Sequence, residues 1–416
     1  MRIISATELS DAYYHDEVLD DIPIVNEIVD AVRQRGDEAV REYTKRFDNV
    51  DLPDYRIKQA QIEDAYTKLS ETQLEAIKAA SRNIKKFAEL QFSMFRDIES
   101  TVPGYRYGHK ILPLKSVGAY VPGGRYPLPS SALMTVIPAK VVGVSQITVC
   151  SPKTAPESIV AADIAGADDI YQIGGAQAIA AMAFGTQSIE RVDKIVGPGN
   201  QYVTAAKKQV YGSVGIDFLA GPSEVMIIAD DSADPEIVAA DLLAQAEHDT
   251  MARADLLTTS KELATSVKSQ VELQLEKLST KPIAGTAIAQ SKIIVADKLN
   301  TLVQIANQRA PEHLELQIRD PDLIIDQLRN YGSLFIGPYS AEVFGDYCSG
   351  PNHTLPTNRV ARYTAGLSVK EYIKIATFQE LNQETIEDLI NTSSELASME
   401  GLEAHKRAAE VRRKLL

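Results

Sequence analysis

The feature that most constrains the fold of this chain is an alternation of short apolar segments with helical ones. The pattern predicts strands at 116–121, 146–150 and 170–173 and helices at 132–142, 158–165 and 178–184. Parallel strands are joined by helical crossovers, and their sheet is covered by helices on both faces. The sequence therefore predicts an α/β fold.

A second stretch of the same kind follows residue 223. Strands are predicted at 225–229, 255–259 and 291–295. After the first of these strands, Asp234 caps a predicted helix that carries Pro235 in its first turn. The likeness of the two stretches suggests a duplication. Helices are predicted for most of the first hundred residues and for the polar tail from about residue 368.

Length and composition narrow the class of protein. A chain of 416 residues is longer than one hydrophobic core usually supports, so two or more domains are expected. The net charge of −14 argues against a nucleic-acid partner, which requires a concentrated basic surface. The most apolar region, 132–150, contains Pro138 and Lys140 and is too broken to span a membrane. Two cysteines, Cys150 and Cys348, give no disulfide framework and suit the reducing cytoplasm.

Gln245 and His248 are the first candidate metal ligands. They stand three residues apart on a predicted helix, so both side chains can point at one atom. An isolated pair of this kind is more often part of a polar helix face, so a metal site needs further ligands. Asp346, in a predicted loop flanked by glycines, can supply one, or it can cap its own loop.

Glu312 and His313 are candidate catalytic residues. They follow Pro311 and are predicted to open a helix or a turn, where both side chains can line one cleft. Histidine is the usual general base near neutral pH, and a carboxylate can activate water. The alternative for Glu312 alone is an acid placed to favour a helix dipole.

Two further histidines stand in unusual settings. His353 lies in an irregular predicted loop, and loops often carry binding residues. His405 lies in the helical tail, five residues after Glu400. A solvated helix is the ordinary interpretation of this tail, and a tail that reaches a neighbouring subunit is the alternative.

Glycine-rich turns stand at two predicted strand-to-helix junctions, Gly174-Gly175 and Gly197 to Asn200. Such turns suit nucleotides, although many are only connections, and neither matches the dinucleotide fingerprint G-x-G-x-x-G. Cys150 ends an apolar strand and is expected to pack as a small hydrophobic residue rather than act as a nucleophile.

Taken together, these motifs resemble those of the histidinol dehydrogenase family. The resemblance extends from about Ser116 to His405, with a helical leader before it. Its segments are 118–124, 174–178, 196–200, 220–224, 245–248, 310–314 and 345–357. Their order and spacing together are far more specific than any one of them.

The resemblance implies a zinc enzyme that forms a homodimer with shared active sites. It would oxidise L-histidinol to L-histidine through the aldehyde with two NAD⁺, the last step of histidine biosynthesis. Glu312 and His313 would be catalytic: His313 would remove the hydroxyl protons, and Glu312 would activate the water that hydrates the aldehyde. One zinc per subunit would mainly orient the substrate, with Lewis-acid help as a second role.

The resemblance also implies a set of binding residues. Zinc would be held by Gln245, His248 and Asp346 of one subunit and His405 of the other. Besides these ligands, the substrate would contact Ser223, His313, His353 and Glu400, and NAD would lie near Tyr120, Gln177 and Asn200.

The family fold implies two main α/β domains, one of them incompletely Rossmann-like, with helical N- and C-terminal extensions. The expected divisions are an N-terminal extension at 1–20, a main domain with the zinc and substrate site at 21–119 plus 223–367, an NAD-binding domain at 120–222, and a C-terminal helical extension at 368–416 that contacts the partner subunit.

Three other functions fit parts of the pattern. A zinc hydrolase would use Glu312 to activate water for amide or ester cleavage. A thiol-based dehydrogenase would use Cys150 or Cys348, and a non-catalytic protein would bind the metal without turnover. A dehydrogenase would produce NADH from histidinol and NAD⁺, whereas a zinc hydrolase would not.

Overall fold

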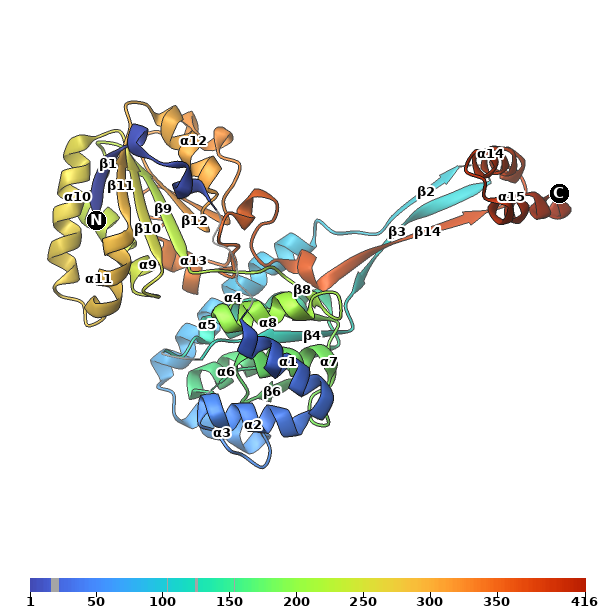
Figure 1. The fold of residues 1–416 in the computed structure, drawn as a ribbon, viewed down its shortest axis with the longest axis horizontal. Coiled ribbons are helices and arrows are strands. Elements are labelled where there is room, and N and C mark those ends of the chain that lie inside the picture. The colour runs from blue at the N-terminus through green and yellow to red at the C-terminus, as the bar shows by residue number, and fades with distance from the viewer. Residues whose placement is uncertain (16–21, 103, 124–125, 153) are drawn as a thin grey trace. The chain divides into compact units, whose positions relative to one another are not determined.

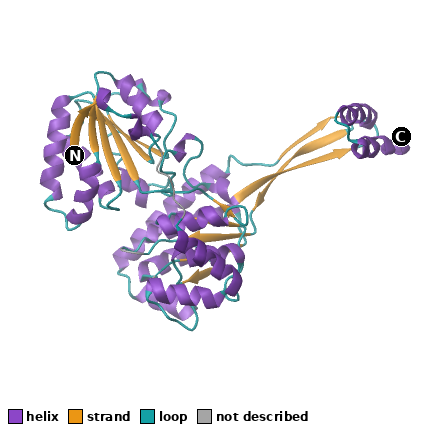
Figure 2. Ribbon diagram, in the orientation of Figure 1, coloured by secondary structure: helices purple, strands orange, loops and turns teal. Residues whose placement is uncertain are grey.

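The computed structural model describes all residues except 16–21, 103, 124–125 and 153 (Figure 1). Contacts divide the chain into two units. The first is Met1–Leu90 with Leu114–Tyr372, and the second is Gln91–Pro113 with Ile373–Leu416. Helices surround two parallel sheets in the first unit, which confirms the predicted α/β class (Figure 2). Among the described residues, no helix combines the length and the apolar character that crossing a membrane requires.

The larger sheet has six parallel strands in the order β1-β11-β10-β9-β12-β13. They are β1 (Arg2–Ser5), β9 (Glu224–Ala229), β10 (Arg253–Thr258), β11 (Lys292–Val295), β12 (His313–Gln317) and β13 (Ser333–Ile336). The strands predicted near 225, 255 and 291 are therefore confirmed.

Helices cover both faces of this sheet (Figure 1). One core contains Val225 and Ile227 with the apolar faces of α9 (Pro235–Ala246), α10 (Lys261–Leu275) and α11 (Lys281–Gln290). The other contains Met226 and Ile228 with α12 (Leu299–Arg309). Successive side chains of a strand point to opposite faces, so β9 contributes to both cores, and all of its residues after Glu224 are apolar.

The smaller sheet has five parallel strands in the order β6-β5-β4-β7-β8. They are β4 (Ser116–Tyr120), β5 (Gln146–Cys150), β6 (Asp169–Tyr171), β7 (Lys194–Val196) and β8 (Gly215–Ile216). Its crossover helices are α5 (Pro129–Val142), α6 (Pro156–Ala165), α7 (Gly175–Phe184) and α8 (Gln201–Val210). If these five strands are numbered from one in chain order, the sheet has the order 3-2-1-4-5. This is the strand order of a Rossmann fold without its last strand, as the resemblance implied. Strands β9 to β13 repeat the same order in the larger sheet, as a duplication predicts.

Packing in the N-terminal part differs from the expected divisions. The first residues are not an extension, because β1 pairs with β11 at the edge of the larger sheet. Helices α1 (Pro23–Arg35) and α2 (Asp37–Asp48) share a core with α7 and α8 beside the smaller sheet. The division between residues 119 and 120 also falls inside β4. Helical periodicity identifies the apolar face of α1, but it does not reveal which sheet that face covers. Two more helices, α3 (Gln59–Thr67) and α4 (Glu71–Phe92), complete the N-terminal part.

The second unit contains a strand where a helical tail was predicted. Strand β14 (Ile373–Leu381) pairs antiparallel with β3 (Tyr105–Pro113), which pairs with β2 (Ile98–Val102). Helices α14 (Ile386–Met399) and α15 (Glu403–Glu410) follow. Most residues of β14 are exposed, so its sequence lacks the alternation that a half-buried strand imposes.

Candidate active site

The centre of the site is the start of two neighbouring strands of the larger sheet. Glu224 begins β9, and His313 begins β12 and pairs in register with Val225. Crossover helices run antiparallel to the strands, so α9 and α12 both end at this amino edge of the sheet. The turns after these helices therefore bring Gln245, His248 and Glu312 toward the same edge.

Glu312 and His313 do not open a helix, in contrast to the prediction. Helix α12 ends at Arg309, and Ala310 has a left-handed φ of 49°, which reverses the chain. Pro311 then leads directly into β12. Both side chains are buried, and the Glu312 carboxylate accepts a hydrogen bond of 2.9 Å from the backbone N–H of Glu224.

The His313 imidazole has one ring nitrogen fixed and the other without a partner. Its Nδ1 lies 3.2 Å from the carbonyl oxygen of Glu224, which can only accept, so Nδ1 carries the proton. Its Nε2 is buried and has no hydrogen-bond partner among the described residues, although Asp346 Oδ1 lies 3.5 Å away. When the ring is neutral, Nε2 presents its lone pair to a reacting group.

Carboxylates surround this imidazole. Glu342 Oε1 lies 3.6 Å and Glu312 Oε2 lies 3.7 Å from His313 Nδ1. Burial opposes a charge on the ring, but Glu342, Glu312 and Asp346 outweigh it and raise the pKa of His313. Burial also raises the pKa of Glu312, to about 8, and raises that of Glu342. Groups with such perturbed pKa values cluster at active sites.

Two of the predicted metal ligands of the first unit, His248 and Asp346, lie close together. Asp346 is on the short helix α13 (Glu342–Tyr347) rather than in a loop, and α13 packs against α9. His248 Nε2 lies 3.9 Å from Asp346 Oδ2. Burial alone would raise the pKa of Asp346, but His313, His353 and His248 lower it.

The prediction that Gln245 and His248 share a helix is wrong. Helix α9 ends at Ala246, and His248 stands in the following turn with its N–H 3.3 Å from the carbonyl oxygen of Gln245. The Gln245 side chain is 1% exposed, and neither amide atom has a hydrogen-bond partner among the described residues. A buried amide without partners is costly, so this side chain is suited to a ligand.

A second grouping of metal-binding side chains shares Asp346. His313, Glu342 and Asp346 offer ligand atoms within 4.8 Å of one another. Glu342 was not predicted from the sequence, because nothing in its local pattern separates it from an ordinary acid in the first turn of a helix.

His353 and Ser223 are predicted substrate contacts at the border of this cluster. The His353 Nδ1 donates to the Asp346 carbonyl oxygen over 2.6 Å, and its Nε2 lies 3.3 Å from Ser131 Oγ. Burial lowers the pKa of His353, which favours the neutral ring. Ser223 directly precedes Glu224, and its carbonyl oxygen accepts from the N–H of Arg253 over 3.1 Å.

Glu400 and His405 belong to the second unit. Glu400 follows α14 as its C-terminal cap, His405 lies on α15, and both are exposed. Their predicted role therefore remains a prediction.

The three residues predicted to bind NAD line one cavity of about 620 Å³, and His248 lines it too. Tyr120 ends β4 and accepts a hydrogen bond of 3.1 Å on its hydroxyl from the N–H of Gly175. Asn200 follows β7 and caps α8. The cavity thus lies where strands β4 and β7 end, the position at which a sheet of this order binds ligands.

Helix α2 adds residues to this cavity that sequence reasoning missed. Gln177 donates a hydrogen bond of 3.3 Å to the carboxylate of Asp48, and the exposed ring of Phe47 lies beside it in the lining. No local pattern could identify them, because α2 is far from the NAD-binding motifs in sequence.

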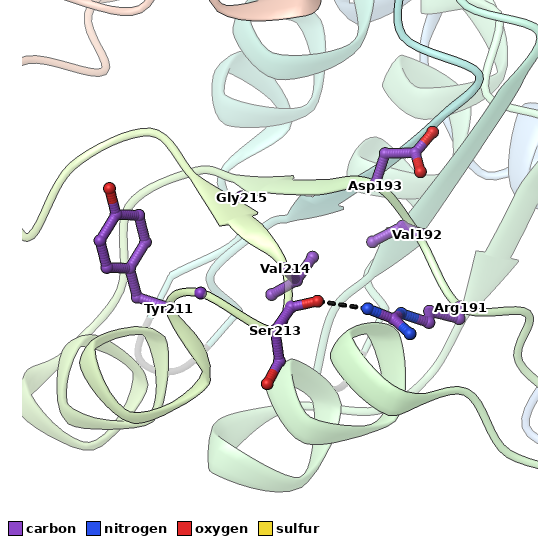
Figure 3. Close-up of a pocket in the computed structure, with 8 residues that line it drawn as sticks. Arg191, Val192, Asp193, Tyr211, Ser213, Val214 and Gly215 are labelled. Atoms are coloured by element: carbon purple, nitrogen blue, oxygen red, sulfur yellow. Dashed lines mark hydrogen bonds between the residues drawn. The ribbon is translucent and has the colours of Figure 1, made fainter. Parts of the chain in front are cut away.

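Another cavity, of about 580 Å³, lies beside β7 and β8 (Figure 3). It is lined by residues 191–193 and 211–215, and the Arg191 guanidinium donates to the Ser213 carbonyl oxygen. Among the described residues, its lining includes no predicted site residue. The thiol of Cys150 is also unsuited to catalysis, because burial raises its pKa to about 12.

Comparisons with known proteins show the family of the chain. A sequence model of the family "Histidinol dehydrogenase" matches residues 15–413. The chain is 43% identical to histidinol dehydrogenase of Methanosarcina barkeri, over 98% of this chain and 96% of that one. It is 46% identical to that of Bacillus cereus, over 93% and 91% of the two chains.

A solved structure has the same fold. The crystal structure of histidinol dehydrogenase from Elizabethkingia anophelis matches with a TM-score of 0.92 and 40% identity, covering 97% of this chain and 95% of that one. The chain therefore belongs to the histidinol dehydrogenase family, NAD-dependent oxidoreductases that catalyse the last step of histidine biosynthesis.

Proposed function

We propose that the chain oxidises L-histidinol to L-histidine in two NAD⁺-dependent steps, with Glu312 and His313 at the reacting atoms. One observation carries the proposal: His248 belongs to both the cluster and the dinucleotide cavity. Its side chain lines the cavity, and its Nε2 lies 3.9 Å from Asp346, which in turn lies 3.5 Å from His313 Nε2. A substrate held at this junction has the base and the hydride acceptor within reach.

His313 is the base of both oxidations. Its Nδ1 proton is held by the Glu224 carbonyl oxygen, which leaves Nε2 to take the hydroxyl proton as hydride moves from carbon to NAD⁺. This step gives the aldehyde and one NADH, and His313 then releases its proton to solvent. Glu312 removes a proton from water as the water adds to the aldehyde carbon, and it then gives that proton to the former carbonyl oxygen, which completes the hydrate. His313 takes a hydroxyl proton of the hydrate as the second hydride leaves, which gives the acid and the second NADH.

Zinc would be held by Gln245, His248 and Asp346 with His405 of the partner subunit, one ion in each subunit. The partnerless amide of Gln245 supports this set, and amide oxygen, imidazole and carboxylate suit a divalent cation. When bound, the ion would orient the nitrogen atoms of the substrate and offset the carboxylates that raise the pKa of His313.

The alternative set of His313, Glu342 and Asp346 is less suitable. It would occupy the Nε2 atom of His313, the only ring nitrogen left for the base, because Nδ1 is committed to Glu224. It would also leave the buried amide of Gln245 without a partner.

A site shared in this way makes the protein a homodimer. His353 and Ser223 border the cluster and are placed to contact the substrate, and Glu400 would approach it from the second unit. The exposure of Glu400 and His405 leaves both side chains available to a partner. The cytoplasmic location stays a prediction from the use of cysteine.

NAD⁺ would bind along Tyr120, Gln177 and Asn200. The Asp48 carboxylate, which already accepts from Gln177, is suited to the hydroxyl groups of a ribose. The hydrolase and the non-catalytic alternatives leave this cavity without a role.

Replacing His313 tests the base. His313→Asn should lower kcat about 10²–10⁴-fold, the contribution of a positioned general base. NADH formation from histidinol and NAD⁺ measures the loss, and zinc content should stay near that of the wild type. A turnover close to wild type would show that His313 is not the base.

Replacing Glu312 tests the hydration step and its pH dependence. Because the carboxylate is the active form and burial raises its pKa to about 8, the hydration rate should rise as pH increases through about 8. Glu312→Gln should remove this rise and slow histidinol oxidation, while oxidation of supplied, prehydrated aldehyde stays nearer normal. Equal losses with both substrates would exclude water activation by Glu312.

Mixed dimers test the shared site. His248→Ala and His405→Ala homodimers should each be nearly inactive, because each site lacks one ligand. Subunit exchange should restore part of the activity, because one of the two sites in a hybrid dimer then has all its wild-type ligands. Mass spectrometry can confirm the exchange, and confirmed hybrids without activity would contradict a site built by two subunits.

A further inference from the structure

We propose that Glu224 and Arg309 form a buried ion pair that positions the catalytic Glu312 and His313. The inference rests on the proposed function, because it takes the roles of Glu312 and His313 from there. Glu224 and Arg309 are positioning residues, since neither is placed at the reacting atoms.

The backbone of Glu224 holds both catalytic side chains. Its N–H donates to Glu312 Oε2 over 2.9 Å, and its carbonyl oxygen accepts from His313 Nδ1 over 3.2 Å. One peptide segment therefore sets the direction of the carboxylate and the tautomer of the imidazole. A shift of this residue would move both groups together.

The side chain of Glu224 is what anchors this segment. Its Oε2 accepts from Arg309 Nη2 over 2.5 Å, and its Oε1 accepts from the N–H of Asn358 over 3.0 Å. Both side chains of the ion pair are 5% exposed. Glu224 therefore joins the start of β9 to the end of α12 and to the loop that follows His353.

Arg309 controls the entry of the chain into the catalytic pair. It is the last residue of α12, and only the left-handed Ala310 and Pro311 separate it from Glu312. The segment from 309 to 313 is thus held at its beginning by the ion pair and at its end by the hydrogen bonds to the Glu224 backbone. These contacts leave little freedom to the two catalytic side chains.

A buried ion pair is a poor source of stability, because desolvation of the two charges offsets their attraction. Here burial raises the pKa of Glu224, and the charges of Arg309 and Arg253 counteract that rise. A well-packed apolar pair would serve stability equally well, but it would not fix the Glu224 backbone at a hydrogen-bonding distance from two side chains. A displacement of about 1 Å at a reacting group can cost about 10²-fold in rate.

The test is a double-mutant cycle between Glu224 and His313. Glu224→Gln keeps the shape of the side chain and removes its charge. We expect its kcat for histidinol to fall at least tenfold, with KM and zinc content near wild type. In the His313→Asn background, the same change should slow the first NADH of a single turnover by less than twofold, because the residue that it positions is already absent.

Glu371→Gln is a matched control. Glu371 is likewise paired with a basic residue of the first unit, Lys194, but it lies outside the cluster, and its variant should keep kcat near wild type. Arg309→Lys provides a second probe of the pair, because it keeps the charge and loses the planar fork. We expect it to lose less kcat than Glu224→Gln.

Two results would overturn the inference. One is an unchanged kcat in folded Glu224→Gln. The other is a loss of the same factor in the wild-type and His313→Asn backgrounds, as a general loss of structure would cause. Failure of the proposed function would instead appear as full activity of His313→Asn alone, so the two failures are distinguishable.

Discussion

The parallel pairing of β9 with β12 is the interaction on which the site depends. It sets Glu224 beside Glu312 and His313, which are 88 and 89 residues away in the chain. The crossover helices α9 and α12 end at the same edge, so the turn with His248 arrives there as well. Sheets of this order usually bind ligands at the carboxyl ends of their strands, and the cavity of about 620 Å³ lies at that position of the smaller sheet. The larger sheet instead contributes its amino edge, and His248 belongs to both the cluster and the dinucleotide cavity.

The cluster is also where the fold leaves polar atoms unsatisfied. Both amide atoms of Gln245, His313 Nε2 and Glu342 Oε2 are buried without hydrogen-bond partners among the described residues. Each such group costs about 1–3 kcal/mol in a folded protein. Two of these groups lie at one carboxylate: His313 Nε2 is 3.5 Å from Asp346 Oδ1, and Glu342 has a ligand atom within 4.8 Å of one on Asp346. A ligand bound there would remove part of this cost. The carboxylates of Glu342, Glu312 and Asp346 raise the pKa of His313. A cation beside them would offset this rise as well as orient the substrate.

Much of the architecture could be predicted from the sequence. The strands near 116, 146, 225 and 291 are short apolar runs bounded by turns, and the alternation with helices gave the parallel sheets. The exposed strand β14 was missed because it lacks a buried face. The sheet that α1 and α2 cover was also missed, since a helix pattern contains no information about its partner.

The site was predictable only in part. Gln245, His248, Glu312 and His313 stood out by residue type and spacing, but the helix expected for the first pair was wrong, and the second pair leads into a strand where a helix or a turn was expected. Helix α9 ends one residue after Gln245, and Ala310 turns the chain into β12 instead. Glu342 gave no signal, and Glu224 stood only at the end of one family segment, because the contacts of both join strands and helices that are distant in the chain. The complete ligand set came from the family resemblance rather than from spacing.

The most direct test of the account is the position of zinc in crystals of the protein with histidinol, located by anomalous scattering at the zinc edge. The account predicts one peak per subunit, within about 2.3 Å of the Gln245 amide oxygen, His248 and Asp346, and beside His405 of the partner subunit. A peak bound instead by His313 and Glu342, with Gln245 uncoordinated, would contradict it.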